Sequence, residues 1–568
     1  MHIDIVPNRK SRPAYLLRES YREGTSVKKR TLANLSSLSD EQLMAIRAVL
    51  QGQSMVPAGK LFEVASSRAQ GHVEAIRVAM SRLGMSALLG GRPSVERERV
   101  LAMIAARILA PHTKLATTRW WHTTTLAEDF GVADATEADL YAAMDWLVER
   151  QDSIQTRLAA RHLKQESLVL YDLSSSYFEG TTCPLARLGY NRDGKAGKLQ
   201  VNYGLMTDRR GCPLAVSVYD GNTADPATLM PQVDRLRKDF GIGQMVLVGD
   251  RGMISHKAIN ELQQQDGIGW ITALKSASIR ALVEQGQIQF GLFDERNLFE
   301  FSHPDYSSER LVACRNPELA KRRAYKREEL LQATEKSLLK VQASVEAGRL
   351  QGQDQIGLRV GRALHQYKVG KHFDLSILDT AFTFKRKDQA IAAEAALDGI
   401  YVIRTSVSAE RMDASDCVRH YKSLAQVERA FRTMKSMDLK IRPIHHRLEE
   451  RVRAHIFLCM LAYYVEWHLR DAWRELMFTD EDQDAKATRD PVAPAQRSAG
   501  AKRKIAAKVL DDETPVHSFA TLIADLGTLV RNTCHAPNAK PGDPTFAITT
   551  NASPKQQRAF DLLQKITL

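Results

Sequence analysis

The chain has 568 residues and a mass of 63.6 kDa, too long for one hydrophobic core, so three or four domains are predicted. Hydrophobic residues make up 44% and charged residues 26%, which excludes a largely disordered chain, and the longest apolar run, Ile456 to Val465, is too short to span a bilayer. The net charge of +13 and the pI near 9.3 are compatible with a polyanionic partner, nucleic acid first.

The N-terminus and the cysteines indicate a cytoplasmic protein. The first residues, MHIDIVPNRKSRP, lack the apolar stretch of a secretory signal. The six cysteines lie far apart, without a C-x-x-C pair. This spacing is typical of reduced, buried thiols rather than of a disulfide frame or a zinc site.

The first 165 residues are predicted to form two regions. Residues 1–38 read as a basic β segment, and residues 1–30 carry eight Lys or Arg against three Asp or Glu. That charge suits DNA contact or a solvated surface. Residues 39–165 show helical periodicity, as at Val100, Leu101 and Ile104. They are predicted to be a helical DNA-binding domain, with a plain structural bundle as the alternative.

From residue 166 the pattern changes to strands. The run SLVLYDLSSS predicts a buried strand that carries Asp172, and two further strand-like runs are joined by DRRG. An amphipathic helix is expected from Asp225 to Phe240, followed by a buried strand that leads to Asp250. An antiparallel meander followed by a helical crossover is how the ribonuclease-H-like fold begins.

The next 177 residues, 251–427, are too many for a loop in a compact domain. They contain strand and helix patterns of their own, so we expect an insertion domain packed beside the catalytic sheet but not part of it. Trp270 could stack on a base displaced from a duplex, but the flanking Ile268 and Ile271 favour a core position. Residues 479–513 are polar and charge-segregated, which predicts a linker or exposed loop before a C-terminal appendage, 514–568.

Two aspartates, Asp172 and Asp250, are expected at the ends of buried strands. A carboxylate there is costly to desolvate unless it is paired or binds a cation, although a single Asp often just begins a turn. Glu428 is the third acid. It shares a predicted helix with Tyr421 and Lys435, and the spacing of seven places all three on one face. The alternative is that Glu428 is a surface residue paired with its i+4 neighbour.

Three acids among basic residues suit phosphodiester chemistry. This chemistry needs an activated water or 3′-hydroxyl, a stabilised pentavalent phosphorus and a stabilised leaving oxygen, and two Mg²⁺ ions about 3.5–4 Å apart supply all three. Mg²⁺ prefers carboxylate oxygens. The basic residues close to these acids in the sequence are Arg192, Lys195, Lys198, Arg251, Arg432 and Lys435.

Five segments together closely resemble the DDE transposases of bacterial insertion sequences: YDLSSSYFEG, GYNRDGK, GLMTDRRGCPLAVSVYDGNTADPATL, VLVGDRGM and YKSLAQVERAFRTMK. They occur in the family's order and spacing. The branch they resemble most has a large insertion before the Glu and a Tyr/Arg/Glu/Lys signature. Leu424 stands at the signature's Arg position, so that phosphate contact would have to come from Lys422 or Arg432.

The resemblance implies that Asp172, Asp250 and Glu428 are the catalytic, metal-binding triad, with two Mg²⁺ ions for which Mn²⁺ can substitute. It implies an α+β or α/β multidomain fold with a ribonuclease-H-like core over 166–250 and 428–478, a mixed, mainly β insertion domain and a helical N-terminal region. The DNA contacts expected from it are Tyr421, Arg432, Lys435, Arg192, Lys198 and Arg251.

The function implied by the resemblance is DNA transposition. The enzyme would cleave the ends of its insertion sequence and join the 3′-hydroxyl ends to target DNA. Its DNA partners would be the double-stranded terminal inverted repeats of the element and the target DNA. Its protein partner would be a second copy of the chain, in a homodimer bound to DNA. We expect it in the bacterial cytoplasm, with the nucleoid when bound to DNA, and not at a membrane.

Three alternatives remain open from the residues. One is a nuclease on the same fold that only hydrolyses, and another is a catalytically silent DNA-binding protein, which the intact acids argue against. The third is a two-carboxylate glycosidase, which would need aromatic sugar-stacking residues near the acids. Only Tyr171, Tyr177 and Tyr203 fit that role.

Overall fold

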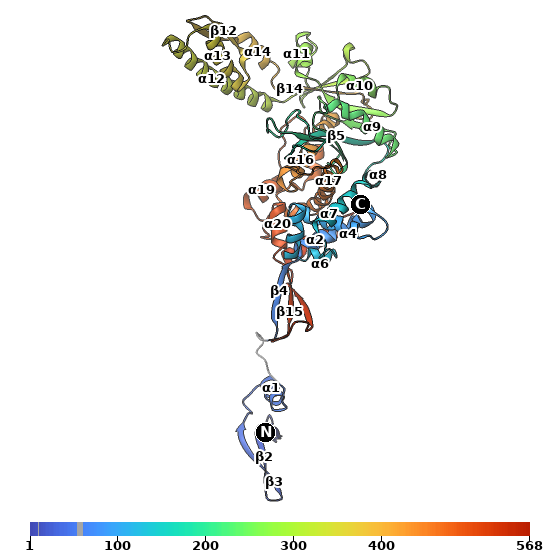
Figure 1. The fold of residues 1–568 in the computed structure, drawn as a ribbon, viewed down its shortest axis with the longest axis vertical. Helices are drawn as coiled ribbons and strands as arrows, with labels where there is room; N and C mark the ends of the chain where they lie inside the picture. Colours follow the sequence, from blue (N-terminus) through green and yellow to red (C-terminus); the bar gives the residue numbers. More distant parts are fainter. Residues whose placement is uncertain (10, 54–60, 568) are drawn as a thin grey trace. The chain divides into compact units, whose positions relative to one another are not determined.

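The computed structural model describes residues 1–9, 11–53 and 61–567. They form two compact units, one of residues 1–68 with 530–550 and one of residues 69–529 with 551–568 (Figure 1). Within these described ranges, no helix combines the length and the hydropathy that crossing a membrane requires.

The described residues of the smaller unit form two three-stranded sheets and the helix α1. The first sheet, in the order β1-β2-β3, comes from the expected basic β segment, and the second has the order β16-β15-β4. The second sheet joins residues from both ends of the chain, so the unit is not built from its first residues alone. The elements are β1 (His2–Val6), β2 (Ala14–Glu23), β3 (Ser26–Asn34), α1 (Asp40–Leu50), β4 (Glu63–Ala69), β15 (Val530–His535) and β16 (Thr545–Thr549).

The larger unit is built on one eight-stranded sheet in the order β10-β11-β14-β9-β8-β5-β6-β7. β5, β6 and β7 form an antiparallel meander, and β8 and β9 continue the sheet parallel to β5. β14, β11 and β10 then extend it in antiparallel pairs. The strands are β5 (Ser167–Tyr177), β6 (Gln200–Asp208), β7 (Pro213–Asp220), β8 (Met245–Val248), β9 (Ile268–Ala273), β10 (Leu298–Phe301), β11 (Arg310–Arg315) and β14 (Ile400–Thr405).

The alternation of side chains along β5 divides two hydrophobic cores. Leu170 packs into the core on the face covered by α16 and α17, whereas Val169, Tyr171 and Leu173 pack on the other face with α9 and α10. Asp172 is two residues from Leu170 and therefore belongs to the α16 face. These four helices are α9 (Leu229–Lys238), α10 (His256–Leu262), α16 (Leu424–Arg432) and α17 (Glu449–Ala472).

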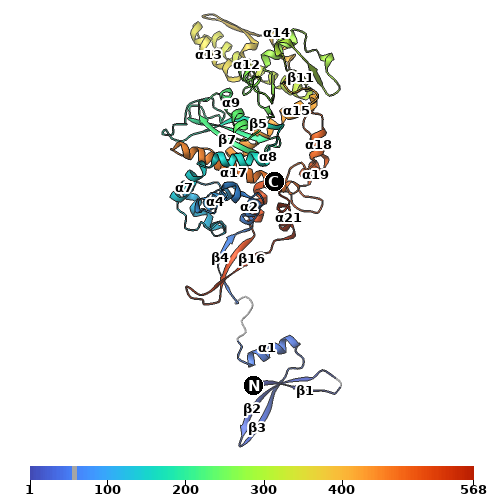
Figure 2. The ribbon, with the colours of Figure 1, turned by 90° about the vertical axis from the view of Figure 1, so that its right-hand side faces the viewer.

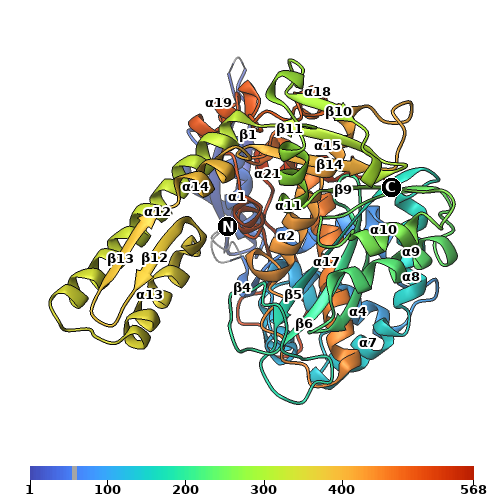
Figure 3. The ribbon, with the colours of Figure 1, turned by 90° about the horizontal axis from the view of Figure 1, so that it is seen from above.

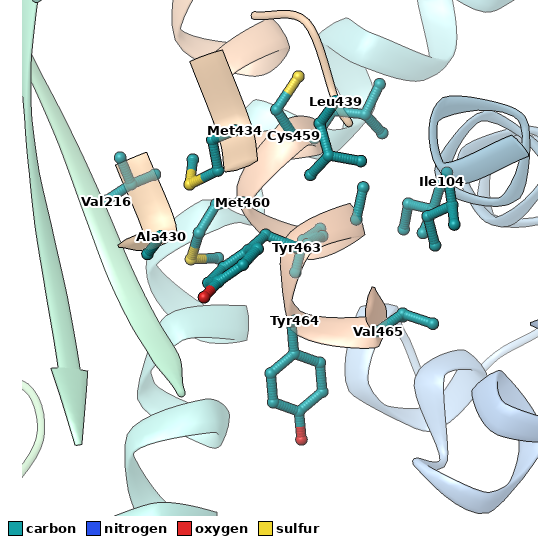
Figure 4. Packing of buried hydrophobic residues seen from close by; sticks show 14 of the residues in the cluster. Ile104, Val216, Ala430, Met434, Leu439, Cys459, Met460, Tyr463, Tyr464 and Val465 are labelled. Carbon is teal, nitrogen blue, oxygen red and sulfur yellow. The ribbon is translucent and has the colours of Figure 1, made fainter. Parts of the chain in front are cut away.

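The central helix is α17, which lies between the sheet and helices α4 and α7 (Figure 2). Residues 454–466 of this helix are buried around its whole circumference, and Phe457 and Met460 are fully buried. Figure 4 shows Met460 and Tyr463 on the side of Val216 of β7, with Ile104 of α4 across the helix. The helices expected over 39–165 thus pack, from α2 onward, into the same core as the sheet.

The helices of this layer and of the C-terminal residues are α2 (Gly71–Arg82), α3 (Met85–Leu89), α4 (Val95–Leu109), α5 (Lys114–Trp120), α6 (Leu126–Asp129), α7 (Glu137–Val148), α8 (Gln151–His162), α18 (Gln483–Thr488), α19 (Ala499–Ala507), α20 (Phe519–Leu526) and α21 (Pro554–Leu563).

The prediction that residues 251–427 stay outside the catalytic sheet is wrong. β9, β10, β11 and β14 all come from this segment and extend the sheet. The reason is visible in β9, an apolar run that is parallel to β8 and buried on both faces, so it needs partners on both edges. Trp270 is 3% exposed in this strand and packs in the core, as its flanking isoleucines indicated.

Only part of the segment has a separate core. Leu331, Leu338, Val360 and Phe373 pack together in a group formed by helices α12, α13 and α14 and the β12–β13 hairpin (Figure 3). The segment as a whole has more helix than strand, so its expected mainly β character is also wrong. Its remaining elements are α11 (Ser276–Glu284), α12 (Pro317–Glu346), α13 (Gln353–Tyr367), β12 (Phe373–Ile377), β13 (Phe382–Arg386), α14 (Asp388–Ala395) and α15 (Ala414–Lys422).

The stretch 479–513 is not a free linker. Val492 is 1% exposed, and its carbonyl oxygen accepts a hydrogen bond of 2.8 Å from Nδ2 of Asn316. The neighbouring carbonyl of Pro491 accepts one from Lys422. The polar composition hid a short apolar anchor whose backbone is held by side chains far away in the sequence.

The separate core of the α12–α14 group can be tested with two adjacent leucines of α12. Leu338 is fully buried and Leu339 is 55% exposed. We expect Leu338→Ala to destabilise the group by about 2–5 kcal/mol, because it opens a cavity, and Leu339→Ala to change stability by less than about 0.5 kcal/mol. Hydrogen exchange of the α12 and α13 amides measures both effects. Equal protection in the two variants would show that no such core exists.

Candidate active site

Asp172 and Asp250 extend from neighbouring parallel strands. β5 pairs with β8 from Ser167 opposite Met245 to Leu170 opposite Val248, a constant offset of 78 residues. The same offset places Asp172 level with Asp250, just beyond the end of β8. Because adjacent strands lie about 4.7–4.9 Å apart, the two carboxylates start from neighbouring backbone positions.

Backbone donors orient both aspartates. Oδ1 of Asp250 accepts hydrogen bonds from the N–H groups of Gly252 (3.0 Å) and Met253 (2.7 Å), so the turn after β8 holds this carboxylate. Oδ1 of Asp172 accepts one from the N–H of Leu173 at 2.9 Å. In each residue the backbone fixes one carboxylate oxygen.

Glu428 joins the aspartates from α16, which packs on β5. Burial first, and then the negative charges of Asp250 and Glu428, raise the pKa of Asp172 to about 7, against the opposing effects of the Leu173 N–H and Arg192. The three acids therefore share one electrostatic neighbourhood. In the described part of the chain, however, the three acids are not among the groups of His, Cys, Asp and Glu side chains whose ligand atoms are close enough together to hold one metal ion.

Tyr421 and Arg251 border the acids. Burial raises the pKa of Tyr421, the charges of Asp250 and Glu428 add to this effect, and the charge of Arg251 opposes it. Tyr421 is therefore close to two of the three acids.

The expected continuous helix over 421–435 is interrupted. α15 ends at Lys422, α16 ends at Arg432, and a π-helical turn, Thr433–Met437, follows. A π turn changes the phase of the side chains. Accordingly, Glu428 is exposed whereas Lys435 is only 8% exposed, so the two do not present one common face to solvent.

Lys435 is part of a buried ionic cluster around Asp193. Its Nζ lies 3.0 Å from Oδ1 of Asp193, and Nη1 of Arg442 lies 2.5 Å from the same oxygen. The second oxygen of Asp193 accepts from the N–H of Tyr177 at 3.0 Å, and the Asp193 side chain is 2% exposed. Burial lowers the pKa of Lys435, and Asp193 counteracts this shift. The cluster ties the loop 189–198 to the end of the Glu428 helix.

Asp193 and Arg442 were not predicted as site residues. Asp193 does lie in the segment GYNRDGK, which was recognised as a motif, but only the basic residues of that segment were assigned a role. Their importance depends on a contact between residues about 240 positions apart, which the sequence spacing does not reveal.

The other side chains predicted to contact DNA differ in whether an acidic side chain already pairs with them. Arg192 is paired with the Asp225 carboxylate, and Lys198 lies 3.0 Å from a carboxylate oxygen of Glu179. Arg251 and Arg432 are exposed.

The structure describes the residue at the signature's Arg position and the two residues that were expected to replace that arginine. Leu424 is buried, and Lys422 donates to the Pro491 carbonyl. Both proposed substitutes are exposed, but Lys422 already donates to a backbone carbonyl.

A pocket of about 390 Å³ lies beside these residues. Its polar lining includes Arg192, Asn202 and Asp225, and Gly252 of the turn that holds Asp250 contributes to it. The pocket thus adjoins the aspartate pair.

The fold and the acidic site belong to a transposase. Residues 164–465, more than half of the chain and including all three acids, match the Transposase DDE domain, so the chain belongs to the DDE transposase family. Residues 3–57 match the N-terminal domain of IS1634 family transposases, which makes it a DDE transposase of an insertion sequence. Family membership removes the glycosidase alternative.

Two solved structures show distant similarity. The piggyBac transposase synaptic complex with hairpin DNA has 10% identity and a TM-score of 0.35, with 83% of this chain and 84% of that chain covered. The Mos1 transposase paired-end complex with the left transposon end has 12% identity and a TM-score of 0.14, with 34% and 62% covered. These scores are too low to carry conclusions about this chain. No curated protein sequence matched it.

Arg432 and Lys435 should behave differently on substitution. We expect Arg432→Gln to reduce the slope of log K against log salt concentration for DNA binding by about 0.9, because an exposed charge can contact phosphate. Lys435→Gln should leave this slope unchanged but lower the free energy of unfolding by about 1–3 kcal/mol, because it takes one partner from the buried Asp193. Binding isotherms at several salt concentrations and denaturant unfolding measure the two quantities. The opposite pattern would place Lys435 on the DNA.

The raised pKa of Asp172 predicts how the metal-free protein responds to pH. In the folded state Asp172 keeps its proton up to about pH 7, whereas the unfolded carboxyl loses it near its ordinary pKa of 3.8. The contribution of Asp172 to stability is therefore lost as pH rises from about 4 to about 7.

The substitution Asp172→Asn should remove this pH-dependent loss of stability, because the asparagine side chain does not ionise. With EDTA present, we expect its Tm to exceed that of the unchanged protein by several degrees at pH 8 and by little at pH 4. Mg²⁺ should raise the Tm of the unchanged protein at pH 8 and so reduce the Tm difference between it and Asp172→Asn. A Tm difference that does not depend on pH would contradict the electrostatic coupling of the three acids.

Proposed function

We propose that this transposase cleaves phosphodiester bonds at the ends of its insertion sequence and joins the resulting 3′-hydroxyl ends to target DNA. The observation that carries the proposal is the shared electrostatic neighbourhood of Asp172, Asp250 and Glu428 within the segment that matches the DDE domain. The catalytic sheet is proposed to be ribonuclease-H-like, comprising the antiparallel β5–β7 meander and the parallel β8 and β9.

The donor set fits divalent cations of the Mg²⁺ type. Three carboxylates offer hard oxygen ligands, and a bound cation would offset both the burial of Asp172 and the neighbouring charges of Asp250 and Glu428, which together raise its pKa. Asp172 and Asp250, on adjacent strands, would hold one ion together, and Glu428 would complete the binding of a second. Two bound Mg²⁺ or Mn²⁺ ions would activate the attacking water or 3′-hydroxyl and stabilise the leaving oxygen.

The protein's own residues would place the DNA. Arg251 and Arg432 are exposed beside the acids and would contact backbone phosphates, and Tyr421 would border the scissile phosphate. The Asp193 cluster would hold the loop that carries Arg192 and Lys198 in place. Terminal inverted repeats, target DNA and a second copy in a homodimer are the proposed partners, and the cytoplasm is the proposed location.

The alternative of a nuclease without strand transfer uses the same acids. It differs only in whether a 3′-hydroxyl or a water attacks the target phosphodiester. The geometry of the acids is the same for both reactions, so the distinction must be made by product analysis.

The test is a strand-transfer assay with a labelled duplex that carries the terminal repeats of the insertion sequence. We expect cleavage and joining with Mg²⁺, and neither product above background with Asp172→Asn, Asp250→Asn or Glu428→Gln. Asp234→Asn is the control, because Asp234 is an exposed acid on α9, on the opposite face of the sheet. Cleavage without joining would favour the nuclease. DNA binding without cleavage by the unchanged protein would refute the enzymatic proposal.

A further inference from the structure

Three metal-ligating side chains meet outside the acidic site. They are His162 at the end of α8, Cys212 in the turn between β6 and β7, and His468 on α17, and their ligand atoms all lie within 4.8 Å of one another. In the described part of the chain, this is the one such set of three. The three ligands come from segments far apart in the sequence. A search for closely spaced cysteines, such as a C-x-x-C pair, therefore could not reveal this site.

The cluster is distinct from the catalytic acids. Asp172 pairs with Leu205, whereas β6 continues three residues further to Asp208, opposite Val169. Cys212 follows in the turn. At about 3.3 Å per residue, the cluster therefore lies at least about 10 Å along the sheet from the level of Asp172.

The distances suit tetrahedral coordination better than hydrogen bonding. Sγ of Cys212 lies 3.8 Å from Nε2 of His468. Zinc bonds of about 2.3 Å to sulfur and about 2.0–2.1 Å to nitrogen, at a tetrahedral angle, separate the two ligand atoms by about 3.6 Å. A thiol held only by one long contact to an imidazole is weakly satisfied, whereas a metal between the two would satisfy both.

The surroundings hold the ligands in place. Cys212 is fully buried, and its backbone N–H donates to Oδ1 of Asp208 at 3.0 Å. Asp208 also pairs with Arg210 at 2.9 Å, which offsets the nearest positive charge of the turn. The His468 ring is 7% exposed and packs against the rings of Trp467 and Tyr464, at 4.9 and 4.8 Å between centroids.

A fourth position and an entry path are also available. The hydroxyl of Tyr464, a residue labelled in Figure 4, lies 3.0 Å from Nε2 of His162, so this hydroxyl or a water can complete the coordination. His162 is only half-buried, which leaves a route from solvent.

We propose that His162, Cys212 and His468 form a structural binding site for a thiophilic divalent transition metal, Zn²⁺ first. On binding, the Cys212 thiol releases its proton to solvent and its sulfur bonds to the metal, without a change of oxidation state. The metal ties together α8, which precedes the strand of Asp172, the β6–β7 turn, and α17. It stabilises the fold behind the active site and takes no part in phosphodiester chemistry.

The test uses the full chain, Co²⁺ as the spectroscopic probe, and excess Mg²⁺ to occupy the carboxylates. We expect a thiolate-to-cobalt charge-transfer band and strong tetrahedral d–d bands that saturate at one equivalent per chain and disappear when Zn²⁺ is added. Cobalt bound by carboxylates gives no thiolate band. Absence of that band in the unchanged protein would overturn the proposal, whatever the variants do.

The variants identify the ligands. Cys212→Ser should abolish the charge-transfer band, and His468→Gln should weaken or abolish it. Cys534→Ser should keep it, since Cys534 is equally buried but lies in the other unit. A band that survives in Cys212→Ser would overturn the site. The readout needs no DNA, so its outcome is independent of the strand-transfer assay.

Discussion

The parallel pairing of β5 with β8 is the constraint on which the acidic site depends. A constant register brings Asp172 level with Asp250, and the α16 face of β5 brings Glu428 to the same place. Burial and the repulsion between close carboxylates both raise the pKa of Asp172, and this shift expresses the cost of the arrangement. The fold tolerates this cost because both strands are fixed by extensive apolar burial on two faces.

The residues around the acids divide into those that hold the site and those that are free to meet DNA. Asp193 holds Lys435, Arg442 and the Tyr177 N–H in a buried cluster, so residues that look like phosphate contacts in the sequence serve partly as anchors. Arg251 and Arg432 stay exposed. Positive charge near a triad is therefore not equivalent to positive charge available to a ligand.

Much of the core could be predicted from the sequence, because its signals are local. The apolar runs of β5 and β8 and the acids that follow or interrupt them are readable from composition and order, and Trp270 was correctly placed in the core by its neighbours. The failures concern long-range contacts. Nothing in the run around β9 shows that it adds to an existing sheet rather than starting a new one, since a buried strand has the same pattern in both cases.

The π turn and the buried position of Val492 are two further features that the local sequence pattern did not reveal. A single extra residue per turn after Arg432 buries Lys435, although the heptad spacing to Glu428 is intact in the sequence. Val492 is surrounded by polar residues, and only its contact with Asn316 reveals that it is anchored. The basic β segment, by contrast, forms strands as its sequence predicted.

The sheet β16-β15-β4 has a consequence for the order of synthesis. β4 emerges from the ribosome early, but its partner β15 is about 460 residues further along the chain. At roughly 5–20 residues per second, the first strand waits about 25–90 seconds for the second. The smaller unit is therefore completed only after residues 69–529 of the larger unit have been made, and a chain that stops before β15 carries the basic β1–β3 sheet and α1 without the completed β16-β15-β4 sheet. Vectorial synthesis thus makes the completed unit a marker of chains that extend beyond β15.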